Sequence, residues 1–159
     1  MSLVKGTNSY STVSEADLYF EDRLDAAAWT SAGNDLKGQA LITATRMLDN
    51  MRWVGVASSE TQKLAFPRTG EYFDPRLGID VALDEDEVPE RVVNATYEIA
   101  YHLLNNDGLL DETGSALSIE VGRIKLDRVR KPSGTPSFAK SLVKPLLLNE
   151  GSTTWWRAN

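Results

Sequence analysis

Residues 89–105 read PERVVNATYEIAYHLLN, and this stretch decides the fold. Pro89 suits the first position of a helix, and Glu90 is favoured there by the positive end of the helix dipole. The apolar residues recur at spacings of three and four and form two adjacent rows on one helix: Val92, Ile99 and Leu103, and Val93, Ala100 and Leu104. We therefore predict a helix over 89–106, roughly 25 Å long, that serves as the central strut of the domain.

Two further helices are predicted on the N-terminal side, over 14–25 and 35–51. Ser14 is the expected cap of the first, with Val13 and Leu18 as a hydrophobic staple. The apolar surface of this first helix is expected to come from Leu18, Tyr19 and Leu24. Residues 26–29 either continue that helix or form a connector.

The second of these helices is expected to be capped by Asn34 and to carry a broad apolar stripe. Its members recur at helical spacing: Leu36, Ala40, Leu41, Ala44, Met47, Leu48 and Met51. Gly38 lowers helix stability by about 1 kcal/mol relative to alanine, so packing must stabilise the helix.

Residues 52–88 follow no helical period, because glycine or proline recurs every few residues. They nevertheless contain several aromatic side chains, which a disordered linker would lack. We expect a long ordered loop that is packed down or used in binding.

The period changes to two within 117–130, where apolar and polar residues alternate on both sides of Gly122. This pattern predicts a β-hairpin or an extended arm. A last short helix is expected from Ser137, interrupted by Pro145. The predicted fold is mainly α: a small bundle of about four helices with a flexible C-terminal tail. Residues 1–136 would form the body and 137–159 a docking helix and tail.

The composition is that of one soluble globular domain, with 159 residues, 42% hydrophobic residues and no cysteine. Lack of cysteine excludes thiol catalysis, thiolate metal sites and disulfides. No apolar run approaches the roughly 20 residues of a membrane-spanning helix, and the first ten residues lack the apolar core of a signal peptide.

Charge is segregated along the chain. Residues 71–112 carry 2 basic and 12 acidic side chains, a net charge of −10, whereas 113–159 carry 8 basic and 3 acidic, a net charge of +5. The two blocks could attract each other within the domain, or each could be a solvated face. Alternatively, the field could orient contact with a charged partner or with a copy of the same chain.

Motifs that support catalysis are not found. His102, the single histidine, lies within the predicted central helix and is expected to pack there rather than act as a base. The acidic run at 84–87 lacks the spacing of a calcium loop, and the chain has no phosphate-binding loop or nucleophile elbow. We expect no enzyme activity, no catalytic residue, no cofactor and no metal.

The basic and aromatic C-terminal third leaves two further readings open. Five basic residues between 123 and 131, with Trp155, Trp156 and Arg157, could bind single-stranded nucleic acid. The two tryptophans could instead fold back on the domain or anchor in another protein, since each is a large apolar surface.

Several stretches, in this order, resemble a family of small tailed-phage proteins described as DnaT-like single-stranded-DNA-binding proteins. They are YSTVSEADLYFEDRLD (10–25), AAAWTS (26–31), ALITATRMLD (40–49), RWVG (52–55), LAFPRTG (64–70), residues 89–104 and the strand at 118–121. The layout is also similar to that of head–tail connector proteins, also called adaptors or head-completion proteins. The family usually has Trp where this chain has Phe66, and the C-terminal third matches less well.

The resemblance implies a virion structural protein that assembles as a ring, expected to be a dodecamer, between the portal and the tail. Its partners would be copies of itself, the portal protein and a tail or nozzle protein, with genomic DNA passing through the channel without sequence-specific binding and no membrane contact. It would reside in the phage neck, after assembly in the host cytoplasm. The alternative is a single-stranded-DNA-binding module.

The expected contact residues form two sets. The portal contact would comprise Phe138, Leu142, Leu146, Leu147, Trp155, Trp156 and Arg157. Contacts between neighbouring subunits would pair the acidic set Asp84, Glu85, Asp86, Glu87 and Glu90 with the basic set Arg123, Lys125, Arg128, Arg130 and Lys131.

Overall fold

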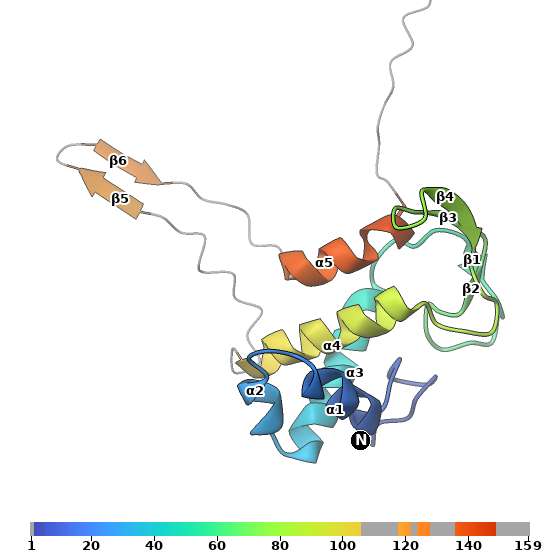
Figure 1. Ribbon diagram of the computed structural model, residues 1–159, viewed down its shortest axis with the longest axis horizontal. Helices are drawn as coiled ribbons and strands as arrows, with labels where there is room; N and C mark the ends of the chain where they lie inside the picture. Colours follow the sequence, from blue (N-terminus) through green and yellow to red (C-terminus); the bar gives the residue numbers. More distant parts are fainter. Residues whose placement is uncertain (1, 106–117, 122–123, 128–135, 149–159) are drawn as a thin grey trace, which may run out of the picture.

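The computed structural model describes residues 2–105, 118–121, 124–127 and 136–148. Its helices are α1 (Val13–Glu21), α2 (Ala27–Thr30), α3 (Asn34–Asp49), α4 (Glu90–Asn105) and α5 (Ser137–Val143), the last followed by the 3-10 turn η2 (Lys144–Leu146). Figure 1 shows α4 running between α3 and α5. In the described part of the chain, every helix is too short or too polar to cross a membrane.

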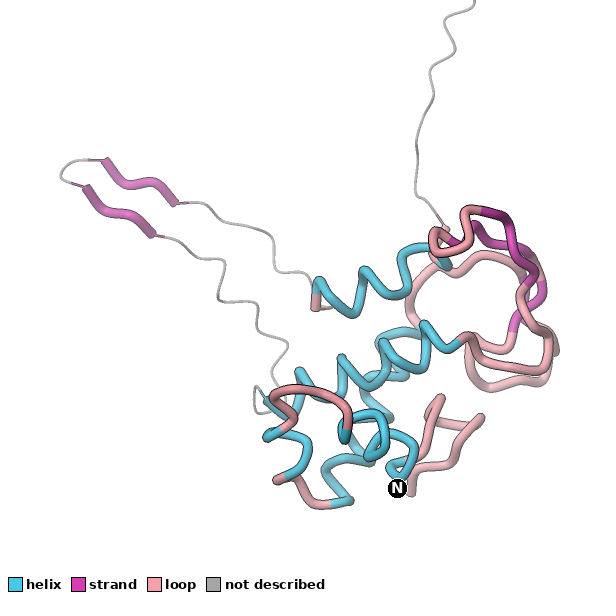
Figure 2. The backbone as a smooth tube through the Cα atoms, viewed as in Figure 1, coloured by secondary structure: helices cyan, strands magenta, loops and turns pink. Residues whose placement is uncertain are grey.

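The strands form three separate antiparallel pairs (Figure 2). These are β1 (Val56–Ala57) with β2 (Arg68–Thr69), β3 (Glu71–Asp74) with β4 (Ile79–Ala82), and β5 (Ser118–Val121) with β6 (Ile124–Asp127). The predicted mainly α fold is confirmed. Within 117–130 the described strands pair as a hairpin, and within 52–88 the chain forms short strands rather than an unbroken loop.

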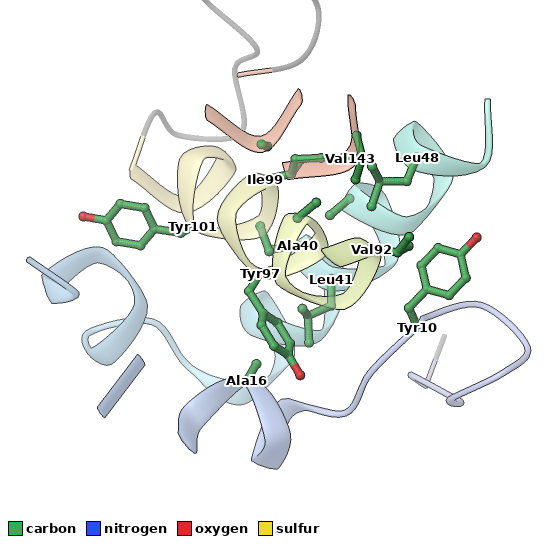
Figure 3. Packing of buried hydrophobic residues seen from close by; sticks show 14 of the residues in the cluster. Tyr10, Ala16, Ala40, Leu41, Leu48, Val92, Tyr97, Ile99, Tyr101 and Val143 are labelled. Atoms are coloured by element: carbon green, nitrogen blue, oxygen red, sulfur yellow. The ribbon is translucent and has the colours of Figure 1, made fainter. Parts of the chain in front are cut away.

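Helix α4 is the centre of the core, as predicted. It buries side chains on more than one side, because α3 and α5 cover it from different directions (Figure 3). Ile99 of α4 has no exposed surface, and neither do Leu41 of α3 and Val143 of α5. Each such side chain stabilises the fold by roughly 1.5–3 kcal/mol. The core is therefore built from chain segments that precede the 118–127 hairpin in the sequence, α3 and α4, and from one that follows it, α5.

Helix α1 begins one residue before the predicted range 14–25 and ends at Glu21, four residues before the predicted end, and its cap is different. Thr12 is the N-cap: its hydroxyl accepts from the amide of Glu15, whose carboxylate accepts from the amide of Thr12. This reciprocal capping box uses the Thr-x-x-Glu spacing and excludes Ser14 as the cap. The inward face is Ala16 and Phe20, so the predictions that Leu18 and Leu24 supply buried surface are wrong; both are exposed.

Residues 26–29 do not continue α1: they lie in the connection to α3, where Ala27–Thr30 form the separate short helix α2. Helix α2 places Trp29 in the core, stacked on Phe20 with 4.7 Å between ring centroids. The indole Nε1 donates to Asp17 (2.8 Å), which also binds Lys37. The carboxylate of Asp17 therefore holds α1, α2 and α3 together.

Helix α3 follows its predicted stripe with two corrections. Its N-cap is Gly33, with no side-chain cap, instead of Asn34. Leu36 is exposed, whereas the residues from the middle of the stripe are buried: Ala40, Leu41, Ala44 and Leu48. In the first turn of α3, Lys37 is the inward residue, bound to Asp17, and Leu36 points to solvent.

The loop between α3 and β3 is fixed by Arg68 and by a close approach of the chain at Gly55 and Gly70. The guanidinium of Arg68 donates to the carbonyls of Val54 (2.8 Å), Ala65 (3.2 Å) and Gly55 (2.6 Å). Gly55 has φ +71°, and a Cβ there would lie 2.1 Å from the carbonyl oxygen of Thr69. The backbone at Gly55, in the RWVG stretch, therefore comes close to that at Thr69, in the FPRTG stretch. A side chain at position 55 would prevent this contact, so glycine is required there.

Aromatic side chains of the same loop enter the core. Phe66 packs edge-on against Trp53 and Tyr10, and all three are buried. The hydroxyl of Tyr10 donates to Asp49, which also accepts from the amide of Ala65. The prediction that the aromatic loop is packed down is confirmed for Trp53 and Phe66.

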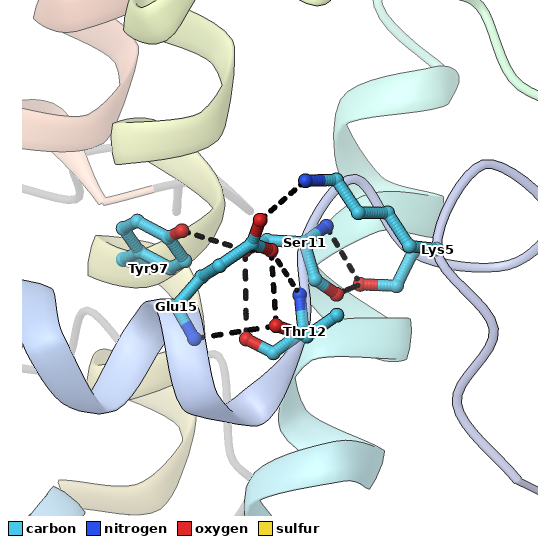
Figure 4. A network of polar contacts seen from close by, with 6 residues as sticks. Lys5, Ser11, Thr12, Glu15 and Tyr97 are labelled. Carbon is cyan, nitrogen blue, oxygen red and sulfur yellow. Dashed lines mark hydrogen bonds and ion pairs between the residues drawn. The ribbon is translucent and has the colours of Figure 1, made fainter.

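A polar network joins the N-terminal segment to α1 and α4 (Figure 4). The carboxylate of Glu15 binds the Lys5 ammonium, the Ser11 hydroxyl and the capping Thr12. Ser11 Oγ in turn lies 2.6 Å from Tyr97 Oη on α4. The hydrogen bond from Lys5, with those from Thr12 and Ser11, lowers the pKa of Glu15 from 4.5 to about 2.

This lowered pKa predicts loss of stability in acid. Unfolded Glu15 takes up a proton near pH 4.5, whereas the folded form does so near 2, so unfolding binds protons within that range. The contribution of Glu15 is fully present above pH 4.5 and is lost as the pH falls towards 2. In Glu15→Gln, which keeps the capping spacing, the pH dependence of unfolding between 4.5 and 2.5 should be shallower by up to about one proton.

Chemical denaturation at a series of pH values measures this slope. Glu21→Gln, at an exposed position of the same helix, should retain the wild-type slope. An unchanged slope in Glu15→Gln would show that Lys5 and Thr12 do not stabilise the ionised carboxylate.

Candidate interaction surfaces

The β3–β4 hairpin presents one face to the body and one to solvent. Its register pairs Phe73 with Asp80 and Tyr72 with Val81, and successive residues of a strand point to opposite faces. Phe73 and Asp80 are exposed, whereas Tyr72 and Val81 are partly buried. The second face therefore packs down at Tyr72 and Val81, and the first face remains open.

Asp74 fixes the hairpin to α4. Its buried carboxylate accepts from the backbone amide of Arg76 (2.8 Å) and from Arg91 Nη2 on α4 (3.1 Å). The Arg76 guanidinium lies 3.6 Å from the other oxygen of the same carboxylate. The amide of Arg76 and the charge of Arg91 hold the pKa of Asp74 below its ordinary value, so the group stays ionised.

Three large apolar side chains of this hairpin are in solvent. Phe73 is 54% exposed, Leu77 in the turn 54%, and Ile79 59%. Glu71 and Asp80, on the same strands, are exposed as well. We call these five residues the hairpin surface. Phe73 is on the open face, Leu77 is in the turn, and Ile79 is opposite Asp74 on the other face. Single exposed apolar residues are normal, but three within seven residues of one hairpin are a concentration that is typical of a contact site.

The predicted acidic contact set lies immediately after this hairpin. All five residues are exposed: Asp84, Glu85, Asp86, Glu87 and Glu90. The carboxylate of Asp84 accepts from the amides of Asp86 and Glu87, which shapes the run into a turn before α4. Together with the hairpin surface, this run makes one end of the domain strongly acidic.

The predicted basic contact set is only partly described. Lys125 lies on β6, directly opposite Glu120 of β5 in the register. The other four members lie outside the described residues: Arg123, Arg128, Arg130 and Lys131.

The predicted portal-contact residues fall into three groups. Phe138 on α5 is 58% exposed. Leu142 and Leu147 are partly buried against the core, and Leu146 has no exposed surface. Trp155, Trp156 and Arg157 lie outside the described residues.

The burial of Leu146 has a backbone cause. Its carbonyl accepts from the amide of Val54, and the amide of Leu148 donates to the carbonyl of Arg52. These bonds draw the segment after α5 onto the loop that follows α3. Leu146 therefore belongs to the core, and Leu142 and Leu147 support it from the rim.

The buried acidic group in the centre of the body also has a structural role. Glu98 on α4 accepts from Tyr19 Oη (2.8 Å) and from Arg23 Nη2 (2.9 Å). The Arg23 guanidinium lies 4.1 Å from the ring centroid of Tyr101, a cation–π contact. Burial and the hydrogen bond to Glu98 raise the pKa of Tyr19. Glu98 thus ties α1 to α4.

His102 is partly buried on α4, as predicted. Within the described ranges, no group of three or more His, Asp or Glu side chains is arranged to hold a metal ion. Every buried side-chain nitrogen or oxygen in the same ranges has a hydrogen-bond partner.

The hairpin surface was missed by sequence reasoning. The signal available was the stretch EYFDPRLGIDVA, residues 71–82, in which a Pro-x-x-Gly turn separates two short alternating runs. What the stretch does not indicate is that Asp74 would be the inward residue and Phe73 the outward one.

Loss of the Asp74 carboxylate should detach the hairpin from α4. In Asp74→Ala, amide hydrogen exchange within 71–82 should accelerate by roughly tenfold or more, because Arg91 and the Arg76 amide lose their acceptor. Asp80→Ala removes a carboxylate from the solvent face and should leave these rates near wild type. Equal rates in the two variants would contradict the anchoring role of Asp74.

Comparison with known proteins gives one family. No curated protein and no solved structure matches the chain. The model of the family described as "Putative DnaT-like ssDNA binding protein" matches residues 2–158, which is nearly the whole chain. The match covers the helical body, the hairpin surface and the C-terminal segment alike. The chain belongs to this DnaT-like family.

Proposed function

We propose that this protein is a head–tail adaptor of a tailed phage, a virion structural protein that acts without catalysis or cofactor. Copies would form a ring, with twelve as the expected number, that joins the portal to the tail and continues the DNA channel. The observation that carries the proposal is an exposed acidic, apolar end on a helical body whose C-terminal third is basic.

Opposite charges on one small domain suit contacts between different faces of identical subunits. Such head-to-tail contacts close into a ring when the rotation between neighbours permits. The acidic partner would be the exposed run Asp84–Glu87 with Glu90. The basic partner would be the Arg123–Lys131 segment of the next copy, which includes strand β6.

The portal contact would use the C-terminal part of the chain. Phe138 is the exposed anchor on α5, and Trp155, Trp156 and Arg157 would complete it. Leu142, Leu146 and Leu147 would support α5 from below rather than meet the portal. Aromatic and arginine side chains are enriched among the residues that dominate binding energy at interfaces.

Neutralising the acidic run should weaken assembly. In Asp84→Asn/Glu85→Gln/Asp86→Asn/Glu87→Gln, the concentration at which copies associate should rise roughly tenfold or more, because the attraction to the basic segment is lost. Sedimentation velocity over a concentration series measures this. The matched control removes four other exposed charges: Glu21→Gln/Asp22→Asn/Asp25→Asn/Asp35→Asn. Equal association of both variants would reject the proposed lateral contact.

A single-stranded-DNA-binding module is the second candidate, and the description of the family favours it. Proteins of this kind stack bases on exposed aromatic side chains along a positively charged groove. In the described residues, Trp29 and Trp53 are buried, whereas Phe73 and Phe138 are exposed. Phe73 has acidic neighbours, so stacking would depend on Phe138, the C-terminal tryptophans and the basic segment.

Salt separates the two candidates. A DNA-binding module that neutralises several phosphates should lose affinity for an oligonucleotide steeply between 50 and 200 mM salt, by about a hundredfold or more for five contacts on a single strand. The adaptor proposal predicts no salt-sensitive binding at micromolar protein. Gel-shift titration of a labelled oligonucleotide at both salt concentrations decides between them.

A further inference from the structure

The hairpin surface carries three exposed apolar side chains, of which Phe73 has acidic neighbours on its own face. Phe73, Leu77 and Ile79 are each more than half exposed, and Glu71 and Asp80 flank Phe73 on the solvent face of the strands. Arg76, the one basic residue of the hairpin, already lies against Asp74. A fitting occupant would therefore present large apolar side chains and a positive charge.

The described chain ends beside this surface. Turn η2 packs against β3, and Figure 1 shows the end of α5 next to β3 and β4. Trp53 and Leu147 form a β-bridge, and the amide of Leu148 donates to the carbonyl of Arg52. The position from which residues 149–159 continue is thus fixed at the hairpin end of the domain.

Residues 149–159 contain the required chemistry. Their sequence, NEGSTTWWRAN, has two adjacent tryptophans followed by Arg157. Six residues, 149–154, lie between Leu148 and Trp155, and the seven steps along the chain reach up to roughly 23 Å when extended. Because turn η2 already packs against β3, this length of chain lets Trp155 reach the hairpin surface without any rearrangement of the body.

We infer that Trp155 and Trp156 dock on the hairpin surface of their own chain, with Arg157 directed to the carboxylates of Glu71 and Asp80. Contact would cover Phe73 and the two indoles, whose burial is favourable because each is a large apolar surface. A short tether makes the contact intramolecular, so its effective concentration exceeds that of any second copy in dilute solution.

This contact goes beyond the proposed function and does not require it. If the chain is an adaptor, the segment that would dock on the portal is held on the hairpin until the portal displaces it. The portal would then bind full-length protein more weakly than protein whose hairpin surface has been altered.

Engineered disulfides test the contact directly, because the chain has no cysteine of its own. Ala82 is small, exposed and on the same face as Phe73, and Thr154 precedes the tryptophans. In Ala82→Cys/Thr154→Cys, mild oxidation of dilute protein should form an intramolecular disulfide at a rate independent of protein concentration. Non-reducing electrophoresis and intact mass, lower by two hydrogens at monomer mass, report it.

The control pair is Leu24→Cys/Thr154→Cys. Leu24 is 93% exposed and follows Arg23, which lies over Tyr101 near the opposite end of α4 from the hairpin. We expect the Ala82 pair to close at least about tenfold faster than the control. Adding Phe73→Ser and Ile79→Ser to the Ala82 pair should remove most of that advantage.

Two results would overturn the inference. Equal closure rates for the Ala82 and Leu24 pairs would show that the tryptophan segment does not occupy the hairpin surface. Disulfide-linked dimers that form in proportion to protein concentration, without the intramolecular product, would assign the surface to the tail of a second copy. Both assays use the isolated chain, so neither outcome decides whether the protein joins portal to tail.

Discussion

Burial of α4 from two directions is the constraint on which the rest of the structure depends. Its apolar residues extend around more than one side of the helix, so α3 alone cannot cover them. Val143 and Ala139 of α5 complete the cover and are themselves fully buried. The chain must therefore return to α4 after the 118–127 hairpin, and this return brings its C-terminal part to the end of the body that carries β3 and β4.

The polar contacts have a different role from the apolar core, because they orient the edges. Glu15 joins α1 to the N-terminal segment, and Asp17 and Glu98 join it to other helices. Asp74 joins the β3–β4 hairpin to α4. Each carboxylate accepts from at least one cation and one further donor, which offsets its desolvation. Because Asp74 fixes the hairpin to α4, Phe73 and the acidic run after β4 remain exposed to solvent.

Elements whose local signals agree could be predicted from sequence. Helix α4 has a terminal proline, an acidic first turn and a doubled apolar row, and its predicted bounds differ by one residue at each end. The burial of single leucines could not be predicted, because it depends on how the helices pack against one another. Leu18 was expected to supply apolar surface and is exposed, whereas Leu146 was expected at a contact surface and is buried in the core. The capping box of Thr12 and Glu15 had a sequence signal, but Ser14 offered a competing one. Of the candidate surfaces, the exposed acidic set was predicted from the sequence. The hairpin surface could not be, because it depends on the contact of Asp74 with α4, which turns one face of the strands inward.

The central claim is that this chain works through surfaces that it offers to copies of itself and to a portal ring. Native mass spectrometry of the wild-type chain, alone and mixed with the portal of its own phage, tests that claim most directly. The account predicts a closed assembly whose mass is a whole multiple of 17.6 kDa, alone or on the portal. A chain that stays monomeric in both samples would contradict it.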